Sequence, residues 1–93
     1  MPKNEKYALG AFEFILLAIS EHKRKHDGKP PKSIRVCTAT LSDILASPKM
    51  GFVMKSTYNE EKRELEFYGT VIIGRPYQHA PSMIDCDNKV VYL

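Results

Sequence analysis

Residues Lys6–His26, KYALGAFEFILLAISEHKRKH, contain no proline and a single glycine. Their composition favours an α-helix, and Asn4 is suited to cap its first turn. At the other end, Gly28 suits the left-handed residue that ends a helix, and Pro30 and Pro31 prevent its continuation. The sequence therefore predicts one long N-terminal helix, roughly 30 Å in length.

Apolar residues surround most of the girth of this helix, whereas an ordinary surface helix buries a face of about 100°. A chain of 93 residues has little other material to cover such a helix on all sides. We therefore expect a homo-oligomer, a dimer or larger, with this helix at the interface. The candidate interface residues are Phe12, Phe14, Leu16 and Leu17.

The rest of the chain predicts one further helix and about four strands. The expected order is a strand at Ile34–Cys37, a short helix at Leu41–Leu45, a hairpin from Phe52–Met54 to Leu65–Tyr68, a strand at Thr70–Ile73 and a last strand at Lys89–Leu93. Gly69 indicates a bulge or a bend that lets one long strand change face. The prediction is a single α+β domain over residues 1–93, with both helices on one face of a mainly antiparallel sheet, in the order α-β-α-β-β-β.

The charge of the chain is unevenly distributed. Residues 22–35 hold six basic residues and one acid, a net +5, whereas the remaining eight basic and ten acidic residues give −2, which together make the +3 of the whole chain. The six basic residues are Lys23, Arg24, Lys25, Lys29, Lys32 and Arg35. They are the candidate phosphate contacts of a nucleic-acid-binding protein, although basic residues also complement the dipole at a helix end. No aromatic residue is interleaved with them in the sequence.

Motifs of catalysis or metal binding are weak. His22 and His26 have a two-ligand spacing on a helix, but Lys23 stands where a metalloprotease has its general base, and the spacing predicts no third ligand. His79, Asp85, Cys86 and Asp87 share one loop without the signature of a cysteine hydrolase. We therefore expect a non-enzymatic protein with no catalytic residues, no metal and no cofactor.

Two cysteines, Cys37 and Cys86, could pair with each other, but in a chain without the pattern of an export signal two unpaired thiols are the favoured expectation. The longest apolar stretch, Tyr7–Ile19, is too short and too interrupted to span a bilayer. The expectation is a cytoplasmic protein without a membrane partner.

The proline-stiffened loop around residues 75–83 combines residue types that dominate binding hot spots. Its candidate partner-binding residues are Arg75, Tyr77, His79 and Met83. The same composition suits a crossover connection that folds Tyr77 and Met83 over the core, and the sequence leaves both readings open.

Several segments together resemble small proteins encoded by bacteriophages and related mobile elements: Ile34–Val36, the helix Leu41–Leu45, the run Leu65–Ile73 leading into the Pro76/Pro81 loop, and Val90–Leu93. The resemblance implies an accessory or virion protein, in the host cytoplasm or the virion, that works by binding. Our leading hypothesis is thus a protein–protein interaction or structural module that self-associates through the N-terminal helix, and the alternative is nucleic-acid binding by the basic segment.

Overall fold

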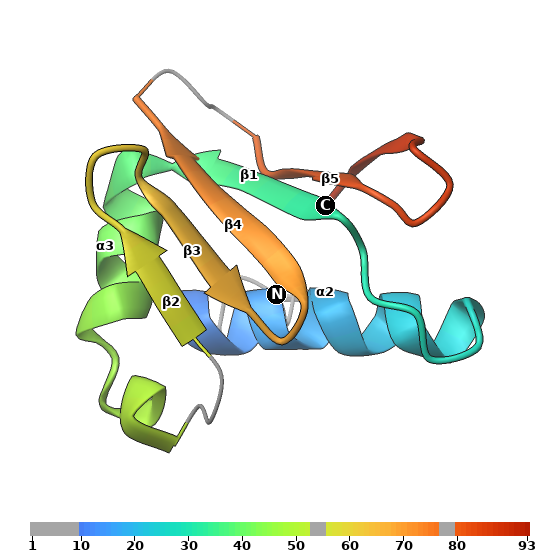
Figure 1. Ribbon diagram of the computed structural model, residues 1–93, viewed down its shortest axis with the longest axis horizontal. Helices are drawn as coiled ribbons and strands as arrows, with labels where there is room; N and C mark the ends of the chain where they lie inside the picture. Colours follow the sequence, from blue (N-terminus) through green and yellow to red (C-terminus); the bar gives the residue numbers. More distant parts are fainter. Residues whose placement is uncertain (1–9, 53–55, 77–79) are drawn as a thin grey trace, which may run out of the picture.

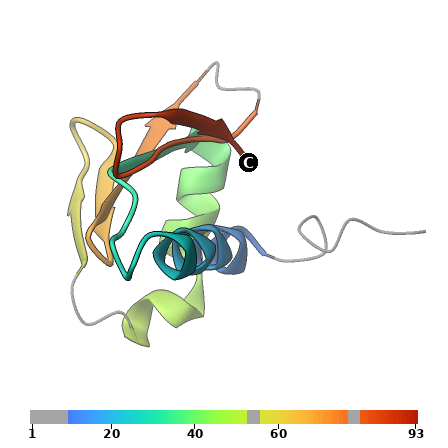
Figure 2. The ribbon, with the colours of Figure 1, turned by 90° about the vertical axis from the view of Figure 1, so that its right-hand side faces the viewer.

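The computed structural model describes residues 10–52, 56–76 and 80–93, in which two α-helices cover one face of a six-stranded sheet (Figures 1 and 2). The elements are α2 (Ala11–Lys25), β1 (Ser33–Cys37), α3 (Thr38–Ala46), the 3₁₀ helix η1 (Pro48–Phe52), β2 (Ser56–Asn59), β3 (Glu64–Phe67), β4 (Thr70–Arg75), β5 (Ser82–Ile84) and β6 (Val90–Tyr92). The predicted α+β class is confirmed, but the sheet has six strands where about four were expected.

The sheet has the strand order β2-β3-β4-β1-β5-β6. Only the central pair, β1 with β4, is parallel, and every other pair is antiparallel. The parallel pair arises because α3 and the β2–β3 hairpin intervene between β1 and β4 in the chain. The edge strands are β2 and β6.

Helix α2 ends as the sequence predicts. Asp27 and Gly28 both have positive φ, at 53° and 81°, and the N–H of Gly28 donates to the carbonyl of Lys23 at 2.7 Å. This hydrogen bond satisfies a carbonyl that the end of the helix would otherwise leave free. The predicted first turn and the Asn4 cap lie outside the described residues, in which α2 begins after Gly10.

The core lies between the helices and the central strands. Phe12 and Ile15 of α2 pack against the sheet, and the ring of Phe12 meets Phe67 edge to face, with centroids 5.4 Å apart. Helix α3 adds the buried side chains of Leu41 and Ile44. Because α3 contacts α2, and Phe12 of α2 contacts Phe67 of the sheet, a single chain covers more of this helix than was expected from the sequence.

The predicted bulge or bend at Gly69 is wrong. Tyr68 and Gly69 have φ of 51° and 82°, and they form a two-residue turn that reverses the chain between β3 and β4, with Phe67 opposite Thr70. Consecutive left-handed residues match the twist of the flanking strands, which is why such turns close tight hairpins. The expected single long strand is therefore a hairpin.

Between the predicted strands Thr70–Ile73 and Lys89–Leu93, where only a loop was expected, lies a strand that the sequence did not reveal. The three residues of β5 pair with β1 and place Met83 in the core opposite Ile34. The last strand is confirmed as β6. The strand predicted at Phe52–Met54 is wrong at Phe52, which ends η1, and the first strand of the hairpin is β2; residues 53–55 lie outside the described ranges.

Two further expectations concern the thiols and the membrane. Cys37 and Cys86 are both free, as predicted. Within residues 10–52, 56–76 and 80–93, no helix has the length and apolar character that crossing a bilayer requires.

Candidate functional site

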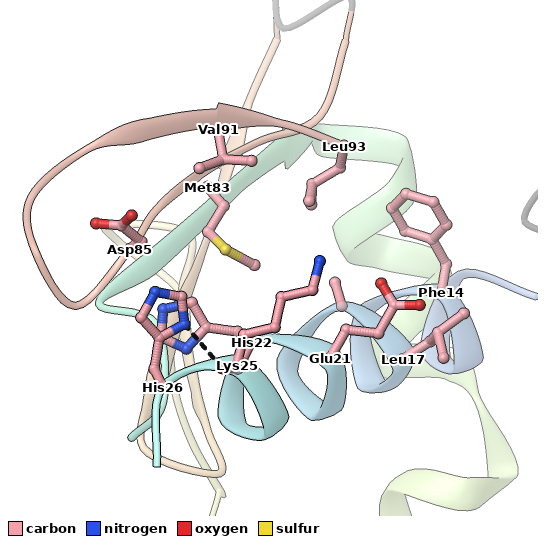
Figure 3. A pocket seen from close by; sticks show the side chains of 11 residues that line it. Phe14, Leu17, Glu21, His22, Lys25, His26, Met83, Asp85, Val91 and Leu93 are labelled. Atoms are coloured by element: carbon pink, nitrogen blue, oxygen red, sulfur yellow. Dashed lines mark hydrogen bonds between the residues drawn. The ribbon is translucent and has the colours of Figure 1, made fainter. Parts of the chain in front are cut away.

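A cavity of about 220 Å³ lies between α2 and the β5–β6 hairpin (Figure 3). In Figure 3, Met83, Val91 and Leu93 point from the hairpin toward α2, Phe14 lies at one end, and two histidines mark the other. The lining residues are Phe14, Leu17, Ala18, Glu21, His22, Lys25, His26, Met83, Asp85, Val91 and Leu93. The cavity thus has an apolar body and a polar end.

His22 anchors the polar end. Its side chain is buried, with 5% exposed, and its Nδ1–H donates to the carbonyl of Lys29 at 2.7 Å. Its Nε2 accepts the backbone N–H of Cys86 at 3.2 Å. Because one partner is an acceptor and the other a donor, the pair fixes a neutral imidazole with its proton on Nδ1. His22 thereby joins α2 to the turn that precedes β6.

His26 lies one helical turn further along α2. Its Nδ1–H donates to the carbonyl of His22 at 2.9 Å, and the two imidazole rings stack with centroids 4.0 Å apart and an angle of 13° between their planes. Because the Nδ1–H of His26 donates to a carbonyl of its own helix, the Nε2 atom on the other side of the ring points away from the helix backbone.

Asp85 organises the turn between β5 and β6. One carboxylate oxygen accepts the N–H groups of Asp87 and Lys89, both at 2.8 Å. The hydrogen bond from Lys89 is the main reason that the pKa of Asp85 is lowered, and the bond from Asp87 adds to it, against the opposing effect of burial. Asp85 therefore brings a carboxylate charge to the polar end of the cavity.

These side chains form two overlapping groups of metal-ligating atoms. The donor atoms of His22, His26 and Cys86 lie within 4.8 Å of one another, and so do those of His26, Asp85 and Asp87. The helical spacing in the sequence predicted only the pair His22 and His26, without a third ligand. Cys86 was missed because it meets His22 across 64 positions of sequence, which local spacing does not reveal.

The β6 edge, Val90–Tyr92, is the most exposed apolar feature of the described residues. Their exposed fractions are 57%, 41% and 76%, and the other large exposed hydrophobic side chains are Tyr58 and Tyr68, both at 39%. The N–H of Asp85 bonds to the carbonyl of Lys89, and the N–H of Leu93 bonds to that of Pro81. Since antiparallel strands alternate, the backbone groups of Val90 and Tyr92 face away from β5.

The structure separates the four predicted interface residues. Phe12 lies in the core, and Leu16 is half-buried against it. Phe14 and Leu17 instead line the cavity beside β6. Phe14 also packs against the core.

The structure places the predicted partner-binding loop residues apart. Met83 is buried in the core, which agrees with the crossover reading at that position. Arg75 is exposed and donates to the carbonyls of Lys62 and Gly74, at 3.2 and 2.8 Å. Tyr77 and His79 lie outside the described residues.

The basic segment spans three elements: Lys23, Arg24 and Lys25 in the last turn of α2, Lys29 and Lys32 in the connector, and Arg35 on β1. The ammonium of Lys23 lies 6.0 Å from the centre of the Tyr68 ring. The fold thus brings an aromatic side chain to this segment, which the sequence order did not indicate.

Comparisons of the chain with protein-family models, with curated proteins and with solved structures found no match.

Proposed function

We propose that this protein is a non-enzymatic protein–protein interaction module whose contact surface is the β6 edge, and that its first partner is a second copy of the same chain. One observation carries the proposal: three consecutive apolar residues on an edge strand expose between 41% and 76% of their surface. Edge strands of monomeric proteins are usually protected by charge, proline or a covering element, because a free edge pairs with other strands.

The two edges of this sheet differ in this respect. The β2 edge has the sequence STYN and runs into Glu60, Glu61 and Lys62, so it is polar and flanked by charge. The β6 edge has the sequence VVY, with Lys89 as the charged residue beside it. The β2 edge is therefore protected by polar and charged residues and the β6 edge is not, which supports association through β6.

Two-fold pairing with a second copy provides hydrogen-bond partners for the outward backbone groups of β6. In an antiparallel arrangement centred on Val91, the outward N–H and C=O groups of Val90 meet those of Tyr92 in the second copy. The two Val91 side chains then lie opposite each other, and both six-stranded sheets join into one. Leu17 and Leu93 line the cavity beneath this strand and extend the apolar surface toward α2.

The double variant Val90→Lys/Tyr92→Lys tests the proposal, because both side chains are exposed and their change leaves the core intact. Charge repulsion across the paired strands raises the dimer dissociation constant at least tenfold, an effect of about 1.4 kcal/mol. Sedimentation equilibrium measures this constant for the wild type and the variant.

The matched control is Tyr58→Lys, an exposed tyrosine on the opposite edge strand. This control leaves the dissociation constant unchanged if β6 is the interface. A wild-type chain that stays monomeric at high micromolar concentration, or equal effects of the two changes, contradicts the proposal.

A second candidate function is nucleic-acid binding by the basic segment. Tyr68, with 39% of its surface exposed and the Lys23 ammonium beside it, supplies a stacking group that this segment lacks in the sequence. Binding of single-stranded oligonucleotides at low salt, measured by fluorescence anisotropy, then weakens both in Lys23→Ala and in Tyr68→Ala. Tyr58→Ala is the matched control, and no binding by the wild type at low salt rules this function out.

A further inference from the structure

The polar end of the cavity holds three donor atoms that suit a transition metal. The imidazoles of His22 and His26 and the thiol of Cys86 place their ligand atoms within 4.8 Å of one another. In a tetrahedral zinc site, bonds of about 2.0 Å to nitrogen and about 2.3 Å to sulfur set the donors about 3.5 Å apart. The three side chains lie at a turn and at a helix end. A movement of roughly 1 Å brings their ligand atoms to the spacing of a zinc site.

Both histidines make the backbone hydrogen bond that metal-ligating histidines make. Each uses Nδ1–H to donate to a backbone carbonyl, His22 to Lys29 and His26 to its own helix at His22. In metal sites, a ligating histidine donates its other N–H in this way, and the bond fixes both the tautomer and the ring. The Nε2 atom is thereby the metal-binding atom of each ring, and in His22 this atom now accepts the N–H of Cys86.

The identity of the donors selects the metal. Imidazole and thiolate favour zinc over magnesium and calcium, which prefer oxygen. Asp85 and Asp87 group with His26 and add negative charge beside the three donors. Three protein donors leave the fourth position of a tetrahedron to water or to one of these carboxylates.

Ion binding requires two local changes. The Nε2 of His22 exchanges the Cys86 N–H, a 3.2 Å hydrogen bond, for the metal. The stacked rings, now 13° from parallel, rotate so that their Nε2 atoms converge. The Cys86 thiol forms its bond to the metal as a thiolate and releases its proton to water.

We propose that His22, His26 and Cys86 bind a Zn²⁺ ion that links the last turn of α2 to the β5–β6 turn. The ion holds in place the segment from which β6 begins. This site lies apart from the outward edge of β6, and it requires no second copy of the chain.

Titration of the reduced, full-length chain with Co²⁺ tests the site, because tetrahedral cobalt gives strong visible bands and a thiolate ligand adds a charge-transfer band in the near ultraviolet. We expect both bands, and we expect Zn²⁺ to displace them at one equivalent. Zinc at a hundredfold excess over its dissociation constant raises Tm by roughly 10–20 °C. Weak absorption typical of octahedral cobalt, or an unchanged Tm, overturns the proposal.

Variants assign the ligands. Cys86→Ser removes the charge-transfer band, and His26→Gln lowers zinc affinity at least tenfold, while Cys37→Ser is the matched control and retains both properties. His26 is the histidine to change because it is half-buried and bonds within its own helix, whereas His22 also supports the fold. A charge-transfer band that survives Cys86→Ser, or one that Cys37→Ser removes, overturns the assignment.

The same titration on the Val90→Lys/Tyr92→Lys variant separates this site from the proposed association. Metal binding persists there even when the variant is monomeric, because none of the three ligands belongs to β6. Loss of the metal spectrum in a folded, monomeric variant contradicts a site contained within one chain.

Discussion

At the scale of single residues, Cys37 illustrates how a helix terminus changes side-chain chemistry. Cys37 is the residue directly before α3, and its sulfur lies 3.0 Å from the hydroxyl oxygen of Thr40. The Thr40 hydroxyl is the main cause of the lowered pKa of Cys37, and the backbone N–H groups of Thr40 and Ala39 add to it. Cys37 therefore has more thiolate at neutral pH than an ordinary thiol.

This shift predicts the pH dependence of alkylation at Cys37. A lowered pKa means that the thiolate forms at lower pH, so the rate with iodoacetamide rises to its plateau below the range of an ordinary thiol, whose pKa is about 8.5. Thr40→Val removes the hydroxyl and moves the midpoint to higher pH. Mass spectrometry of the Cys86→Ser protein, with and without Thr40→Val, follows this rate, and identical profiles for the two proteins contradict the assigned cause.

The polar end of the cavity shows what residue-level reasoning finds and misses. The spacing of His22 and His26 correctly places them on neighbouring turns of one helix. Their hydrogen-bond partners depend on the connector and on the β5–β6 turn, and these reach the helix only in the folded chain. The histidine pair could be predicted from local periodicity, whereas its contact with Cys86 could not.

At the scale of elements, the sequence predicted helices and strands best where particular residue types restrict the backbone conformation. Gly28, which has a positive φ in the structure, and the prolines after it correctly predicted the end of α2. The β-branched run at Ile34–Cys37 correctly predicted β1. The three-residue β5 has too little sequence for a period-two pattern, and it exists because β1 offers it a free edge. Gly69 was predicted as a bulge or bend within one long strand, and the pairing between β3 and β4 shows a turn instead.

The packing of α3 on β4 makes a prediction at this scale. A Cβ atom added to Gly74 would lie 2.7 Å from Cδ2 and 3.2 Å from Cβ of Leu41, so the helix contacts the strand where it has no side chain. Gly74→Val therefore lowers the free energy of unfolding by about 1–3 kcal/mol. Urea denaturation measures the loss.

A double-mutant cycle identifies the cause of that loss. Leu41→Ala alone costs about 2–5 kcal/mol because it leaves a cavity in the core. In combination with Gly74→Val, the added valine occupies part of that space, and the total loss is smaller than the sum of the single changes. Additive losses contradict direct contact between these two positions.

At the scale of the whole molecule, the abundance of apolar residues in α2 has two structural causes. One side of the helix packs on the sheet and another meets α3, so Phe12 and Leu16 serve the chain's own core. Phe14 and Leu17 lie by the cavity beside β6. The sequence indicated uncovered apolar surface on the N-terminal helix, whereas the most exposed apolar side chains of the described residues are on the last strand, where three residues are too few to stand out.

Hydrogen exchange at Val90 and Tyr92 tests association through β6 most directly. The outward N–H groups of these two residues are free in one chain and bonded in the paired sheet, whereas the N–H of Val91 faces β5 in both states. We predict that raising the protein concentration from low to high micromolar slows exchange at Val90 and Tyr92 at least tenfold, an effect of about 1.4 kcal/mol, and leaves Val91 unchanged. Exchange at Val90 and Tyr92 that is independent of concentration would contradict association through β6.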